Sequence, residues 1–132
     1  MRILLDTNVF LWAIGGVGAR ISAAAKRALD DDDNDLVLSA VSLWEIALKT
    51  RSGKLGVPER GEFFRDHMSR LGVEMVLPVY ASHVFEMFAL PDLPEHHRDP
   101  FDRLLVAQSR HEGYPIVSSD SMLRKYPIEV IW

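Results

Sequence analysis

The sequence predicts an α/β fold: a three-layer α/β/α sandwich around a central, mostly parallel sheet of four to five strands. Short, continuous apolar runs alternate along the chain with longer stretches of helical spacing. Strands that are apolar throughout indicate a sheet covered on both faces, as parallel sheets are. No repeat, linker or low-complexity block divides the 132 residues, so we expect one domain over residues 1–132.

Five apolar runs are the candidate strands, because they are too short and too continuous for amphipathic helices. They cover residues 3–5, 36–38, 75–77, 116–117 and 130–131. The helical stretches cover residues 8–14, 19–30, 40–50, 59–70, 80–89, 100–112 and 119–125. Gly72, Gly113 and Pro115 stand at helix ends, where glycine and proline are expected.

Composition narrows the classes of function. The chain has no cysteine, which excludes a disulfide or a thiolate metal site. Asp6 interrupts the first apolar run too early for a signal peptide, and no apolar stretch approaches the ~20 residues that span a bilayer, so we expect a cytoplasmic protein without membrane association. The net charge of −4 argues against a general nucleic-acid binder, but it allows an enzyme that reaches phosphates through divalent cations.

Carboxylates follow the candidate strands. Asp6 comes directly after the first strand, and Asp120 follows the fourth. Glu45 lies two turns into the helix after the second strand, and Ser39 is the expected cap of this helix. Parallel α/β sheets place their sites at the carboxyl ends of the strands, so these three acids are expected at one edge. Asp102 joins them if the helix that it opens begins at the same edge.

Each of these acids also has a purely structural interpretation. Helix capping alone accounts for Asp99 and Asp102, because an acidic cap, a proline and an acid in the first turn are a strong helix start. Asp120 can complement a helix dipole. Glu45 can pair with Lys49 one turn later, in the favoured order.

The combination of acids favours a metal site. The helix of Glu45 is apolar around much of its circumference, and a carboxylate there is costly unless it is paired, protonated or bound to a cation. Converging carboxylates suit a hard cation, Mg²⁺ or Mn²⁺, whereas Zn²⁺ usually recruits histidine or cysteine. An ion held by carboxylates suits phosphoryl chemistry, since it activates a water and neutralises phosphate charge without a side-chain nucleophile.

Three segments together resemble a protein family. They are LLDTN at residues 4–8, SLWEI at residues 42–46 and HRDPFDR at residues 97–103. In this order and chain length they resemble a PIN-domain ribonuclease, most closely the VapC-type toxin of type II toxin–antitoxin pairs. The resemblance covers nearly the whole chain.

The resemblance implies a PIN-like sandwich and a Mg²⁺-dependent endoribonuclease (Mn²⁺ is the alternative ion), which hydrolyses RNA phosphodiesters with a metal-activated water. It also implies a homodimer and a cognate antitoxin protein, and it leaves the target RNA open. By position, the catalytic and metal-binding acids are Asp6, Glu45 and Asp102. Asp120 matches a less uniform fourth acid, and a metal role for Asp99 is less direct. Polar positions near the family's site, expected to orient carboxylates or waters, are Asn8 and Ser118.

Basic residues near the acids are candidates for RNA contacts, although a solvated charged surface explains some of them as well. The candidates are Lys49, Arg51, Arg98 and Arg103. His96 and His97, adjacent in a loop, are interpreted as surface residues.

Other functions fit the sequence less well. A haloacid-dehalogenase-like phosphatase needs a second acid two residues after the first, where Asn8 stands. A response-regulator receiver needs an aspartate after the third strand, where Leu77 and Pro78 stand. The alternative of another class is a non-catalytic PIN-like module that binds RNA or protein, and the intact central acids argue against it.

Overall fold

Five strands form the central sheet of the computed structural model, which describes residues 1–16, 18–56, 61–93 and 99–132. The strands are β1 (Arg2–Leu5), β2 (Asp35–Ser39), β3 (Val73–Leu77), β4 (Ile116–Val117) and β5 (Val130–Ile131). Their spatial order is β3-β2-β1-β4-β5, and every neighbouring pair is parallel. The predicted strands are confirmed, and the sheet is wholly rather than mostly parallel.

Helices separate the strands along the chain. The α-helices in the described ranges are α1 (Thr7–Ile14), α2 (Ala23–Asp30), α3 (Ala40–Arg51), α4 (Gly61–Leu71), α5 (Ala81–Ala89) and α6 (Pro100–Glu112). The 3₁₀ helices are η1 (Gly18–Arg20) and η2 (Ser121–Lys125). In this part of the chain, no helix is both long enough and apolar enough to cross a membrane.

Two of the predicted helices differ from the structure. The stretch 19–30 is not one helix, because Ser22 has an extended backbone and its side chain accepts a hydrogen bond from the Ala25 amide at 3.1 Å. A serine in this conformation begins a helix rather than continuing one, so the stretch divides into η1 and α2. The stretch 119–125 forms the shorter 3₁₀ helix η2.

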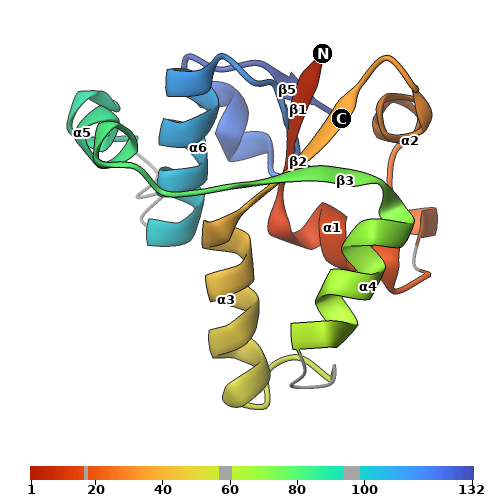
Figure 1. Ribbon diagram of the computed structural model, residues 1–132. Coiled ribbons are helices and arrows are strands. Elements are labelled where there is room, and N and C mark those ends of the chain that lie inside the picture. Colours follow the sequence, from red (N-terminus) through yellow and green to blue (C-terminus); the bar gives the residue numbers. More distant parts are fainter. Residues whose placement is uncertain (17, 57–60, 94–98) are drawn as a thin grey trace.

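The helices cover both faces of the sheet (Figure 1). On one face, Ile3 and Leu5 of β1 pack in a core to which α1, α2 and α4 contribute. On the other face, Leu4 packs in a second core with side chains of α6. β1 is therefore buried on both sides, which is why its apolar run is continuous. This confirms the three predicted layers.

All the strands end at the same edge of the sheet, and this edge positions the acids. α1 and α3 begin there directly after β1 and β2. Figure 1 shows that α6 also begins at this edge and runs back toward the opposite one. Asp102, in the first turn of α6, therefore lies at the edge where the other acids are expected. The strand order reverses between β1 and β4, which makes this edge a topological switch point.

Candidate active site

Asp6 lies directly after β1, where the strand ends in the middle of the sheet. Its residue is only 6% exposed, and its Oδ2 accepts a hydrogen bond from the Ser118 hydroxyl at 2.6 Å. Burial raises the pKa of Asp6, and the charges of Glu45 and Asp120 add to this, whereas the hydrogen bond from Ser118 opposes it. A buried carboxylate held in this way favours a nearby cation.

Ser118 connects the ends of β1 and β4. Besides donating to Asp6, its Oγ accepts a hydrogen bond from the Asp120 amide at 3.1 Å. The structure thus places this predicted supporting residue in contact with a central acid. Asn8, the other predicted supporting residue, is exposed on the first turn of α1 and has no hydrogen bond to these acids among the described residues.

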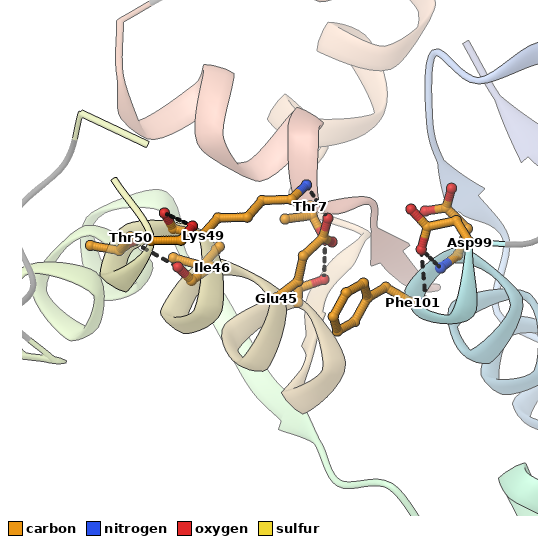
Figure 2. A network of polar contacts seen from close by, with 10 residues as sticks. Thr7, Glu45, Ile46, Lys49, Thr50, Asp99 and Phe101 are labelled. Atoms are coloured by element: carbon orange, nitrogen blue, oxygen red, sulfur yellow. Dashed lines mark hydrogen bonds and ion pairs between the residues drawn. The ribbon is translucent and has the colours of Figure 1, made fainter. Parts of the chain in front are cut away.

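Glu45 is presented by α3, which begins after β2. The Ser39 side chain caps this helix, as expected, by accepting a hydrogen bond from the Val41 amide at 3.0 Å. Glu45 is buried, and its Oε2 lies 2.5 Å from Nζ of Lys49 (Figure 2). The predicted pairing of Glu45 with Lys49 is therefore present.

Asp99 and Asp102 begin α6 and have different roles there. Oδ1 of Asp99 accepts hydrogen bonds from the amides of Phe101 at 2.9 Å and Asp102 at 3.2 Å, which makes it the N-cap (Figure 2). The half-buried carboxyl of Asp102 has its pKa raised to about 7, first by burial and then by the charge of Asp99. Further contributions to the raised pKa come from Asp6, Glu45 and Asp120. The acids predicted from the strand ends therefore lie close enough to repel one another.

Asp120 also has a structural role in addition to its place near the other acids. Its Oδ1 accepts a hydrogen bond from the Met122 amide at 2.9 Å and thereby caps η2. Its charge raises the pKa of both Asp6 and Asp102. Asp120 therefore both caps η2 and belongs to the acidic cluster.

Two contacts that the sequence did not suggest hold the helices of the site in place. Thr7 at the start of α1 donates a hydrogen bond to the Ser42 hydroxyl of α3 at 2.8 Å. The rings of Trp44 and Phe101 meet edge to face at 4.8 Å and join α3 to the start of α6. All four residues lie in the segments that carry the family resemblance, but sequence spacing does not reveal contacts between them.

The basic residues predicted to contact RNA differ in their surroundings and in their contacts. Lys49 contacts Glu45, and Arg51 is exposed beside α4. Nη1 of Arg103 donates to the Tyr126 hydroxyl at 3.2 Å, so this guanidinium is held against the protein. The predictions for Arg98, His96 and His97 fall outside the described residues.

The chemistry of the donor set fits a hard divalent cation. The side chains that converge at the carboxyl edge offer carboxylate oxygens, the ligands that Mg²⁺ and Mn²⁺ prefer. In the described ranges, no three acid or histidine side chains are already arranged to hold an ion. Nζ of Lys49 contacts one carboxylate oxygen of Glu45, and the Ser118 hydroxyl contacts one carboxylate oxygen of Asp6, so an ion at these acids would share them with both groups.

A cavity of about 450 Å³ lies elsewhere, between α3 and α4. Its lining is mainly apolar, with Ile46, Phe64 and Met68 among the residues that form it. None of the five acids lines it. The acids therefore lie at the carboxyl edge of the sheet and outside this cavity.

Comparisons with known proteins show the family of this chain. The family model described as "PIN domain" matches residues 3–129. No curated protein matches the chain in sequence.

Solved structures with a similar fold include a VapBC2 complex of Rickettsia felis bound to promoter DNA, with a TM-score of 0.71, 16% identity and coverage of 98% of this chain and 97% of that one. A DNA-bound VapBC complex of Salmonella typhimurium has a TM-score of 0.66 and 14% identity, with 98% and 96% covered. The FitAcB structure of Neisseria gonorrhoeae has a TM-score of 0.52 and 15% identity, with 98% and 96% covered. At these identities the likeness concerns the fold. Because the family model matches the chain over residues 3–129, the chain belongs to the PIN-domain family.

Proposed function

We propose that this protein is a Mg²⁺- or Mn²⁺-dependent endoribonuclease, a single PIN-like nuclease domain that acts as the toxin of a toxin–antitoxin pair. The observation that carries the proposal is the convergence of Asp6, Glu45 and Asp102 at the carboxyl edge, where each acid faces the charges of others. Carboxylates brought together at such a cost to stability are typical of a site that binds a cation. Membership of the PIN-domain family supports the same activity.

The three central acids would hold the ion, with Asp120 as a further candidate ligand. When bound, the ion supplies an activated water and neutralises charge on the phosphate. Ser118 keeps the Asp6 carboxylate oriented, and Asp99 fixes the first turn of α6 and thereby Asp102. RNA contacts of Lys49, Arg51, Arg98 and Arg103 stay predictions.

The partners are an RNA substrate, a small antitoxin protein and a second copy of the chain. The similar structures from Rickettsia felis and Salmonella typhimurium are VapBC complexes, which supports an antitoxin partner here. Exposed apolar side chains support protein–protein contacts, because Phe85 and Phe88 of α5 are 70% and 84% exposed.

The activity is tested with purified protein and unstructured RNA. We expect cleavage in Mg²⁺ or Mn²⁺, none in EDTA, and recovery when the ion is restored. Asp6→Asn should lower the rate by at least about 100-fold, since even residues behind the ligands of a metal site contribute roughly 10- to 100-fold. The matched control is Asp30→Asn, which makes the same change at an exposed residue at the end of α2.

Cleavage that persists in EDTA would refute the metal mechanism. A folded wild-type protein that binds RNA but does not cleave it in any divalent ion would favour the non-catalytic module instead.

The toxin role is tested in cells. Expression of the wild-type protein alone should stop growth, because an unrestrained ribonuclease destroys RNA that the cell needs, whereas Asp6→Asn should allow growth at the same protein level. Soluble wild-type protein that leaves growth unaffected would contradict the toxin role without contradicting the nuclease activity. If expression stops growth, mapping of RNA ends after brief expression would identify the target RNA.

A further inference from the structure

Lys49 places a positive charge inside the acidic cluster. It stands one turn after Glu45 on α3, and its Nζ lies 2.5 Å from Oε2 of that residue. The Glu45 side chain is only 7% exposed, whereas the Lys49 side chain is 41% exposed. Figure 2 shows the lysine extended along the helix so that its ammonium ends at the Glu45 carboxylate. The pair is thus anchored on the buried acid and open to solvent on the side of the lysine.

The ammonium responds to more of the cluster than Glu45 alone. The pKa of Lys49 is raised, first by the hydrogen bond to Glu45 and then by the charges of Glu45, Asp99 and Asp102. Lys49 therefore partly offsets the repulsion among the acids. A divalent ion bound by the same carboxylates would do the same, and two cations that share one carboxylate would repel each other.

We propose that the Lys49 ammonium is a resident cation of the site, which competes with the divalent ion for the Glu45 carboxylate. The inference rests on the proposed metal-dependent function. In the metal-free protein, Lys49 holds Glu45 in place and balances its charge. When the ion binds, the ammonium leaves Oε2, and its flexible, half-exposed side chain allows this without disturbing the buried glutamate. Lys49 thereby sets the metal affinity of the site.

The proposal predicts opposite effects on metal affinity and on metal-free stability. Lys49→Met keeps much of the aliphatic side chain but removes the competing charge. We expect its Kd for Mn²⁺ to fall about tenfold, the change that corresponds to 1.4 kcal/mol. In EDTA the same variant should unfold at a lower urea concentration than the wild type, because Glu45 is left buried without its partner.

The experiment is calorimetric titration of each folded protein with Mn²⁺ and, separately, Mg²⁺, at pH 7.5 and constant ionic strength. Lys26→Met is the matched control, since it removes the same charge from an exposed residue of α2. Its Kd should equal that of the wild type. Lys49→Arg should bind metal as the wild type does, within about threefold, because arginine can also pair with the carboxylate.

The outcomes separate this inference from the proposed function. Equal Kd values for Lys49→Met and Lys26→Met would overturn the competition but leave the metal site intact. Weaker binding by Lys49→Met would also overturn it, because the lysine would then assist the ion. A wild-type protein that binds neither ion would overturn the metal site and this inference together. If Lys49→Met does not fold, Lys49→Gln is titrated in its place, with the same expected direction.

Discussion

Polar and titratable groups are buried in two regions of this protein, and the electrostatic surroundings of these groups are opposite in the two regions. At the carboxyl edge, burial and then the charges of neighbouring acids raise the pKa of Asp6 and of Asp102. Between α5 and α6, His83 is fully buried, and both of its ring nitrogens have hydrogen-bond partners. Repulsion among the acids of the first region destabilises the metal-free protein, whereas the polar groups of the second region have their hydrogen-bond partners within the fold.

The buried polar chain between α5 and α6 extends to the start of α3. Nε2 of His83 lies 2.7 Å from Oε1 of Glu112, and Nδ1 accepts a hydrogen bond from the Tyr80 amide at 3.0 Å. Nε2 of Gln108 lies 3.4 Å from the same Nδ1, and Oε1 of Gln108 accepts a hydrogen bond from the Ser39 hydroxyl at 2.5 Å. This network joins α5, α6 and the cap of α3, so it supports the site without belonging to it.

The contrast suggests a division of tasks. Satisfied buried networks rigidify a structure, while repelling groups are retained where function requires them. Changes in the acidic cluster should therefore alter metal binding and the pH dependence of stability. Changes in the polar chain should lower stability without altering the response to metal.

The largest effect on stability is expected from Asp102 and depends on pH. Its pKa is raised from 3.8 to about 7 in the folded protein, so the folded state binds this proton more tightly than the unfolded state does. The free energy of unfolding of the metal-free protein should therefore fall as pH rises from about 4 through 7, by at most about 4 kcal/mol from this group. Asp102→Asn lacks this contribution and should be at least as stable as the wild type at pH 8 in EDTA.

Urea denaturation of both proteins at pH 5 and pH 8, with and without Mg²⁺, measures this effect. Mg²⁺ should stabilise the wild type and have little effect on Asp102→Asn. Asp99→Asn keeps the helix cap, because asparagine also caps helices, but it removes a charge that raises the pKa of Asp102, so stability should fall less with pH in this variant than in the wild type. A clearly less stable Asp102→Asn variant that still cleaves RNA would make Asp102 a structural acid and remove it from the site.

The sequence predicts the acidic cluster better than the polar chain for a physical reason. Asp6 follows β1 directly, and Glu45 lies on the helix that follows β2, so in a parallel sheet both acids come to the same edge. Asp102 could be placed only conditionally, since the edge at which α6 begins depends on the connection after α5. For Lys49, helical spacing predicted the pair with Glu45 but could not decide between that role and an RNA contact.

The polar chain has no comparable sequence signal. His83 and Gln108 lie on different helices, and their contact crosses 25 residues of sequence. Polar residues on helices ordinarily face solvent, so nothing marks these two as buried. Ser39 was predicted as a helix cap from its position after a strand, but its bond to Gln108 spans 69 residues and follows only from the packing of α6. Local patterns predict elements and their ends, whereas such contacts depend on how helices pack.

The smaller effect on stability is expected from His83→Ala, which tests the polar chain. The substitution leaves the Tyr80 amide and the Glu112 carboxylate without their histidine partner and opens a cavity beside Gln108. We expect a loss of about 3 kcal/mol in the free energy of unfolding, typical of breaking a buried hydrogen-bond network. His111→Ala removes an exposed ring that packs edge to face against His83 at 5.4 Å, and it should cost about 1 kcal/mol, clearly less than His83→Ala. The stabilisation by Mg²⁺ should be the same in His83→Ala as in the wild type, because no acid of the cluster contacts this ring. If the variant lost its response to Mg²⁺ while remaining folded, the two regions would be coupled through α3, and the division between them would not hold.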